Sequence, residues 1–183
     1  MNNPTPPRIP AMSLSPVDHV LGAPDARVVV IEYGDFECPV CAQAYHGVKI
    51  MLKHFKHRIR FAFRHFPIVA AHPNAELAAE AAEAAGAQGK FWQMHDRLFE
   101  NQQHLKAKAL RQYAAAIEID LARFDADLAD HIYLQRVQEH LASGRASGVR
   151  STPGFFVDGK VVDISFGMDR LSKAIDARLI KAR

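Results

Sequence analysis

The chain has 183 residues, of which 49% are hydrophobic and 23% are charged, and its formal net charge at pH 7 is +3. Such a composition is typical of a soluble globular protein, and the length fits one domain or one domain with a sizeable insertion. Basic residues form no dense block, which argues against nucleic acid as a partner. No apolar run reaches the roughly 18 residues of a membrane-spanning helix, so we expect no membrane span.

The first 20 residues are expected to form a disordered arm. Four of the first ten residues are proline, which excludes a helical start. The same stretch lacks the charged and apolar regions of a secretory signal, which predicts a cytoplasmic protein. If a signal has been removed, the protein is instead periplasmic or otherwise extracytoplasmic.

The hydrophobic pattern after this arm predicts alternating strands and helices. Residues 27–33, RVVVIEY, form a β-branched run typical of a strand buried on both faces. A helix follows the two cysteines, because apolar residues recur at spacings of three and four from Tyr45 to Phe55. The remaining expected strands are 59–66, 154–157 and 160–164, and the remaining expected helices are 74–86, 90–101, 107–117, 120–128, 132–147 and 168–182.

The order of these elements predicts an α/β fold with an all-helical insertion. Residues 21–66 would form the first half of the α/β layer, residues 67–148 the insertion and residues 149–183 the second half. Asn74 and Asp120 are expected helix N-caps.

Cys38 and Cys41 are the only cysteines of the chain, and they lie in the segment CPVC between an expected strand and an expected helix. A helix N-terminus carries unpaired N–H groups and a positive partial charge, which stabilise a thiolate. The thiolate is the nucleophile of disulfide exchange. This placement predicts that Cys38 attacks and that Cys41, one turn inside the helix, resolves the mixed disulfide.

Two other interpretations of the pair are less consistent with the sequence. A structural zinc site needs four ligands, and neither a second C-x-x-C nor a histidine pair at finger spacing is present. Two buried, unreactive cysteines would not require the strand–helix junction or Pro39 in the first helical turn. We therefore expect no metal site.

Four segments together resemble the DsbA-like thiol–disulfide oxidoreductases of the thioredoxin superfamily, in particular the BdbD-like branch. They are EYGDFECPVC, FRHFP, GKFWQMHDRLFEN and GVRSTPGFFVDGK, and they stand in the family's order across about residues 20–180. The resemblance implies a thioredoxin fold with a helical insertion. It also implies that the Thr152-Pro153 bond is cis and that both residues face the disulfide and bind extended substrate.

The resemblance further implies roles for residues around the cysteines. Glu32 would be a buried acid that takes the proton of Cys41, and Phe36 would pack beside the disulfide and contact substrate. The dipeptide Pro39-Val40 lacks the histidine of the strong oxidants of the family, so we expect a Cys38 pKa of roughly 5–6.5 and an oxidant of intermediate strength. The negative charge of Glu37 should oppose the thiolate only weakly. The histidines His65, His72 and His95 are expected to be capping, loop or core-edge residues.

The sequence thus predicts an enzyme that exchanges disulfides with protein or peptide thiols and is reset by a redox partner. The Cys38–Cys41 disulfide carries the redox equivalents, so we expect no cofactor. A cytosolic disulfide reductase, a glutathione-linked detoxification enzyme and a non-catalytic peptide-binding module remain as alternatives. The intact CPVC argues against the last of these.

Overall fold

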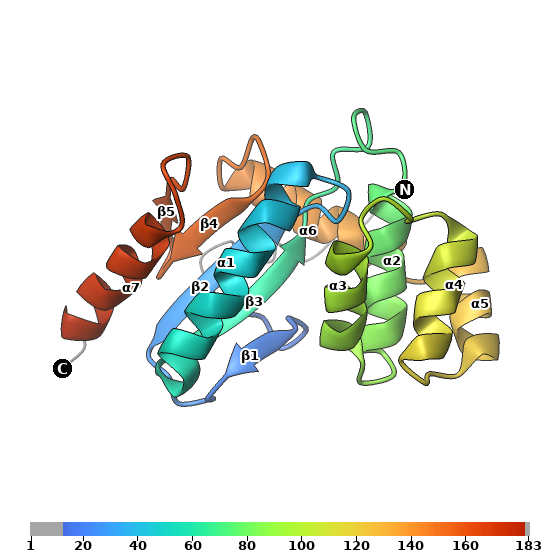
Figure 1. Ribbon diagram of the computed structural model, residues 1–183, viewed down its shortest axis with the longest axis horizontal. Coiled ribbons are helices and arrows are strands. Elements are labelled where there is room, and N and C mark those ends of the chain that lie inside the picture. The colour runs from blue at the N-terminus through green and yellow to red at the C-terminus, as the bar shows by residue number, and fades with distance from the viewer. Residues whose placement is uncertain (1–12, 182–183) are drawn as a thin grey trace, which may run out of the picture.

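The computed structural model describes residues 13–181, which fold into a mixed five-stranded sheet covered by helices on both faces (Figure 1). The strand order is β1-β3-β2-β4-β5. Strands β2 and β3 are parallel, and the other neighbouring pairs are antiparallel. The strands are β1 (Val20–Gly22), β2 (Val28–Gly34), β3 (Ile59–His65), β4 (Gly154–Val157) and β5 (Lys160–Val162).

Helices from the two ends of the chain cover the sheet. Figure 1 shows α1 (Pro39–Phe55) crossing in front of β2 and β3, α7 (Asp169–Lys181) beside β4, and α6 (Leu134–Ala146) on the other face. A short 3-10 helix, Lys56–Arg58, links α1 to β3. The four remaining helices lie together at one side of the sheet, and they are α2 (Ala75–Gly86), α3 (Phe91–Glu100), α4 (Ala107–Ala116) and α5 (Leu121–Ala129).

Strand β2 is buried on both faces, as its β-branched sequence predicts. Val28 and Val30 join the larger core beneath α1. Ile31 and Tyr33 join a smaller core on the opposite face. Because side chains alternate along a strand, Glu32 points to the same face as Val28 and Val30, toward α1. The strand thus places one carboxyl group inside the larger core.

The insertion shares this larger core. Helix α2 contributes small buried residues, including Ala78, Ala81 and Ala85, which allow close helix packing. Met94 of α3 is fully buried and Trp92 is partly buried against the same cluster. The insertion is therefore packed continuously with the sheet and α1. No helix among residues 13–181 is long and apolar enough to span a membrane.

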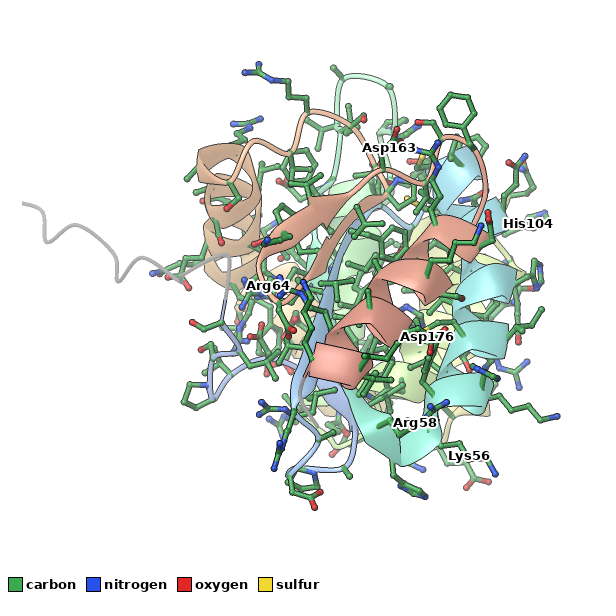
Figure 2. All side chains as sticks on the ribbon, turned by 90° about the vertical axis from the view of Figure 1, so that its left-hand side faces the viewer. Lys56, Arg58, Arg64, His104, Asp163 and Asp176 are labelled. Atoms are coloured by element: carbon green, nitrogen blue, oxygen red, sulfur yellow. The ribbon has the colours of Figure 1, made fainter. Side chains whose placement is uncertain are left out.

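The prediction of a disordered arm is wrong for residues 13–20. Residues 1–12 lie outside the described part of the chain. Asp18 forms two short bonds to the buried Arg64 guanidinium, at 2.9 and 2.7 Å. Arg64 also donates to the Tyr33 hydroxyl and to the Ser13 carbonyl. Figure 2 shows Arg64 on the sheet face opposite α1. A buried charge needs such partners, so the segment before β1 is held against the sheet.

Three local expectations also require correction. Ile132 lies in the turn before α6 and is exposed, because His131 has a positive φ of 51° and the helix starts only at Leu134. Asn74 precedes α2 without a capping side-chain bond, whereas Asp120 does cap α5 by accepting from the N–H of Arg123. Strand β5 ends at Val162, two residues earlier than expected.

Candidate active site

Cys38 occupies the N-cap position of α1, with φ −75° and ψ 121°, and no side chain caps the helix there. Pro39 stands in the first turn, where its fixed φ suits the helix and its missing N–H is not needed. No acidic residue lies in that turn. The free N–H groups of the helix are therefore available to the sulfur of Cys38.

The environment of Cys38 strongly favours its thiolate. A hydrogen bond from the Cys41 thiol, opposed by burial, lowers the pKa of Cys38 to about 5. The Thr152 side chain and the backbone N–H groups of Cys41 and Val40 contribute to this lowered value. This pKa lies at the low end of the range expected from the sequence. The helix terminus and the local hydrogen-bond donors therefore outweigh the lack of a histidine at position 40.

Cys41 differs from Cys38 in its surroundings. It is fully buried, and burial, the hydrogen bond to Cys38 and the charges of Glu32 and Cys38 raise its pKa well above the ordinary value. Both residues are thiols in this structure. The pair therefore consists of one sulfur that ionises readily and one that holds its proton, which is the division expected of attacking and resolving cysteines.

Glu32 is buried beneath this pair, as expected. Its side chain lies between Phe63 of β3 and Phe155 of β4, its partners in the sheet register. Its Oε1 has no hydrogen-bond partner among the described residues. Burial raises the pKa of Glu32 to about 8. The group can therefore hold a proton at neutral pH and release it slightly above.

The Thr152-Pro153 peptide bond is cis, as the sequence resemblance predicted. Cys38 Sγ lies 3.5 Å from the Thr152 carbonyl oxygen, to which the thiol donates. The Thr152 hydroxyl is buried and has no other partner in the described part of the chain, so it is free to donate to the thiolate. Thr152 therefore faces the reactive sulfur.

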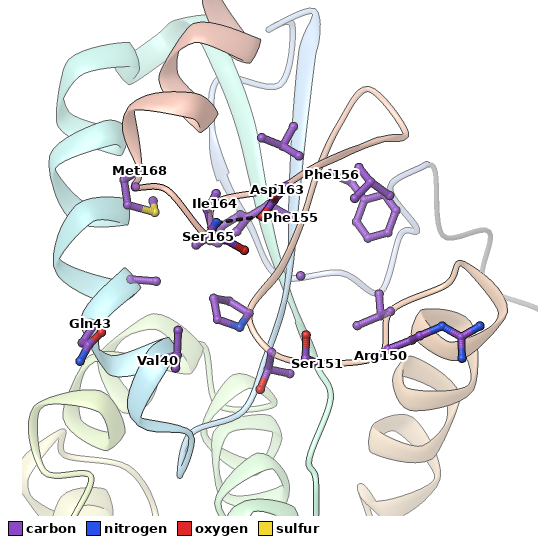
Figure 3. Close-up of a pocket in the computed structure, with 18 of the residues that line it drawn as sticks. Val40, Gln43, Arg150, Ser151, Phe155, Phe156, Asp163, Ile164, Ser165 and Met168 are labelled. Carbon is purple, nitrogen blue, oxygen red and sulfur yellow. Dashed lines mark hydrogen bonds between the residues drawn. The ribbon is translucent and has the colours of Figure 1, made fainter.

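A groove of about 740 Å³ opens beside these residues (Figure 3). Val40 and Gln43 of α1 form one wall, and Arg150, Ser151 and the start of β4 form another. Met168 and the segment after β5 close the third side. Val40 is 52% exposed, so the dipeptide presents an apolar side chain at the edge of the groove.

The predicted substrate contact of Phe36 is not available in this structure. Phe36 is 1% exposed and packs against Phe63 and Phe99. The rings of His65 and His95 also lie against Phe36. Phe36 belongs to the same cluster as both cysteines. It thus supports from inside the core the candidate catalytic loop, residues 35–38, between β2 and α1.

Side chains that sequence reasoning missed hold the catalytic loop from outside. Gln102, in the α3–α4 loop, donates to the carbonyls of Phe36 and Cys38 at 2.9 and 2.8 Å. The buried Asp35 accepts from the N–H groups of Glu37 and Ile68, both at 2.8 Å. A polar residue three positions before a C-x-x-C would have been the only sequence signal for Asp35.

Two further contacts join the loop to the segment before α2. His72 Nδ1 lies 2.7 Å from Asp35 Oδ2, so the expected loop histidine has a specific acidic partner. The Glu37 carboxylate accepts from the backbone N–H and the side-chain amide of Asn74, at 2.6 and 2.7 Å. Glu37 thus satisfies the N-terminus of α2 in place of the expected Asn74 cap.

A buried histidine cluster lies behind the site. His65, Glu83 and His140 bring possible ligand atoms within 4.8 Å of one another. His65 Nε2 and Glu83 Oε1 are 2.8 Å apart and bond directly, whereas two ligands of a tetrahedral zinc ion would stand about 3.3 Å apart. His19 bonds to the second oxygen of Glu83 at 3.0 Å. In the described residues this cluster does not include Cys38 or Cys41.

Comparison with known proteins agrees with this architecture. The family model described as Thioredoxin matches residues 14–177. The chain is 44% identical over 166 residues to a Na(+)/H(+) antiporter NhaA 1 of Salinispora arenicola, covering 91% of this chain and 25% of that protein. It is 40% identical over 166 residues to a Na(+)/H(+) antiporter NhaA of Herminiimonas arsenicoxydans, again covering 91% and 25%. The chain spans about a quarter of the length of the curated relatives it matches.

Solved structures are similar over almost the whole chain. BdbD from Bacillus subtilis gives a TM-score of 0.81 at 24% identity, covering 87% of this chain and 91% of that one. A thioredoxin-like oxidoreductase from Silicibacter pomeroyi DSS-3 gives 0.81 at 25% identity, covering 92% and 95%. The thiol-disulfide exchange protein alpha-DsbA2 from Wolbachia pipientis gives 0.78 at 20% identity, covering 89% and 88%. These likenesses confirm the expected DsbA-like fold with its helical insertion.

Proposed function

Because the chain belongs to the thioredoxin family, we propose that it is a thiol–disulfide oxidoreductase that exchanges disulfides with protein or peptide substrates. The observation that carries this proposal is the opposite perturbation of its two cysteines. The pKa of Cys38 falls to about 5, whereas that of the buried Cys41 rises well above its ordinary value. An inert buried pair would have no reason to differ in this way.

In the oxidising direction, a substrate thiolate attacks Cys38 Sγ of the Cys38–Cys41 disulfide. A substrate–Cys38 disulfide forms, the Cys38–Cys41 bond breaks, and Cys41 leaves as a thiolate. Protonated Glu32, whose pKa is about 8, supplies the proton that Cys41 needs. A second substrate thiolate then attacks the substrate sulfur of the mixed disulfide, and Cys38 leaves as a stabilised thiolate.

Two electrons have then passed from two substrate thiols to the protein disulfide, and each step reverses for reduction. The disulfide itself carries these electrons, so the proposed chemistry uses no cofactor. A separate redox partner must reoxidise or reduce the pair after each turnover.

The groove beside Thr152 and Pro153 is the proposed binding site for an extended substrate segment. The apolar part of its lining, which includes Val40 and Phe155, suits a peptide whose side chains alternate between the groove and solvent. Val40 lies beside the attacking sulfur and would contact the residue next to the substrate cysteine. Substrate contact by Phe36 is not part of this proposal, because Phe36 lies in the core.

Disulfide donation is the favoured direction. A Cys38 pKa of about 5 lies between those of thioredoxin, about 7, and of DsbA, about 3.5. A stabilised thiolate favours the reduced protein and so makes its disulfide more oxidising. Disulfides persist outside the cytosol, so we propose an extracytoplasmic site of action in place of the expected cytoplasmic one.

Trapping the mixed disulfide tests the proposal. Cys41→Ser should accumulate a disulfide between Cys38 and a substrate cysteine, visible by non-reducing electrophoresis and mass spectrometry, whereas Cys38→Ser should trap nothing. Wild-type protein should form the Cys38–Cys41 disulfide in glutathione buffers. If no intramolecular disulfide forms at any glutathione ratio and Cys38→Ser still binds peptide, the chain is a binding module.

A further inference from the structure

The segment between β3 and α2 brings one titratable base to the catalytic loop. His72 Nδ1 lies 2.7 Å from Oδ2 of Asp35, whose side chain is fully buried, whereas that of His72 is 17% exposed. Asp35 also accepts the N–H groups of Glu37 and Ile68, and its backbone carbonyl accepts the N–H of Cys38. The imidazole is therefore fixed to the same residue that shapes the turn into Cys38.

The charges around this histidine favour its protonated form. Burial lowers the pKa of His72, but the hydrogen bond and charge of Asp35 and the charges of Cys38 and Glu37 outweigh it, so the pKa is raised above 6.5. Asp35, Cys38 and Glu37 are the charged groups that act on it from the catalytic loop. An electrostatic coupling between two titrating groups is mutual, so whatever Cys38 does to His72, His72 does to Cys38.

The other acidic group of the loop, Glu37, is bonded to the N-terminus of α2. Its carboxylate accepts two short hydrogen bonds from Asn74 there. The buried carboxylate of Asp35, by contrast, pairs with His72. A positive charge on His72 therefore lies beside the acid whose backbone carbonyl accepts the N–H of Cys38.

We propose that His72, held by Asp35, is a positioning residue whose imidazolium stabilises the Cys38 thiolate. The inference rests on the proposed oxidoreductase function and extends it. The apolar Val40 cannot provide a cation within the dipeptide, and the helical insertion supplies one from the other side of the loop. Reduction of the disulfide, which creates the Cys38 negative charge, should then draw a proton onto His72.

The test compares His72→Asn with a matched control. The Asn side-chain amide occupies nearly the same place as Nδ1 of histidine, so it keeps a donor for Asp35 and removes only the charge. His131→Asn is the control, because His131 Nδ1 also bonds to a carboxylate, Glu80, at 3.0 Å, within the insertion and outside the catalytic loop. Both variants are measured in the full chain.

His72→Asn should raise the pKa of Cys38, which is measured from the absorbance of the thiolate as the pH is varied. It should also shift the dithiol–disulfide equilibrium with glutathione toward the disulfide by about three- to tenfold near pH 6. His131→Asn should change neither quantity. The difference between wild type and His72→Asn should be largest between about pH 5, above which Cys38 is ionised, and pH 6.5. It should fade below that range and disappear as the pH rises through the raised pKa of His72. A residue that only braced the loop would produce no such pH profile.

A second measurement needs no variant. The pKa of His72, followed by NMR of its ring protons, should be higher in the reduced than in the oxidised protein. Equal His72 pKa values in the two redox states, or equal Cys38 titrations in wild type and His72→Asn, would overturn the inference and leave the oxidoreductase proposal intact. Failure of the disulfide to form would overturn that proposal, while the Cys38 titration would still decide the role of His72.

Discussion

Replacing Glu32 by glutamine should make the protein's stability much less sensitive to pH. Burial raises the pKa of Glu32 from 4.5 to about 8 in the folded protein, whereas the unfolded chain ionises near 4.5. Between these values the folded state binds one proton more than the unfolded state. The free energy of unfolding therefore falls as the pH rises from 4.5 to 8, by at most about 5 kcal/mol at roughly 1.4 kcal/mol per pKa unit.

Urea denaturation between pH 5 and pH 9 would measure this effect. Cys38→Ala and Cys41→Ala should be present in every protein compared, because they remove thiol titration from the curves. The stability gained by Glu32→Gln should then grow steadily with pH and level off above about pH 8. Glu118→Gln, which alters an exposed carboxylate, is the matched control and should show no such growth.

A flat difference between the Glu32→Gln and parent curves would refute the reasoning. It would mean that Glu32 ionises as an exposed carboxyl does, either because water reaches it or because the pocket opens. A carboxyl that is fully ionised at neutral pH could not supply the proton that Cys41 requires.

Three further changes test other parts of the site. Cys41→Ala should raise the pKa of Cys38 from about 5, because the Cys41 hydrogen bond is the largest influence that lowers it; an unchanged thiolate titration would contradict this. Val40→His should lower the same pKa and shift the glutathione equilibrium several-fold toward the dithiol, whereas a shift toward the disulfide would be inconsistent with thiolate stabilisation. Gln102→Ala should lower the free energy of unfolding by about 1–2 kcal/mol in urea, because two carbonyls each lose one hydrogen bond. The neighbouring exposed Gln103→Ala is its control, and equal losses would contradict the role of Gln102.

The catalytic centre could be predicted from the sequence because its parts are local. Strand β2, the CPVC segment and α1 are consecutive, so the position of Cys38 at a helix N-terminus follows from hydrophobic spacing alone. The burial of Glu32 followed from the β-branched run that precedes it. Pro153 was found through the resemblance, since nothing in its own neighbourhood indicates a cis bond.

The residues that support the loop could not be predicted, because their partners are distant in sequence. His72 and Asp35 are 37 residues apart and Gln102 and Cys38 are 64 apart, and no periodicity links such positions. Strand β1 was missed because three residues are too short to show alternation. The substrate contact predicted for Phe36 is wrong, because the motif shows that Phe36 is close to the cysteines but does not show which way its ring points.

The support of the catalytic loop by the insertion limits how far the fold can be simplified. A minimal chain without residues 67–148 would keep both cysteines and Pro153. In such a chain the carbonyls of Phe36 and Cys38 would lose the hydrogen bonds from Gln102, and Asp35 would lose its bond to His72. Phe36 would also lose its contact with Phe99. Transplanting CPVC into another thioredoxin scaffold would omit the same contacts. The motif supplies the two sulfurs, and residues of the insertion hold the loop that presents them.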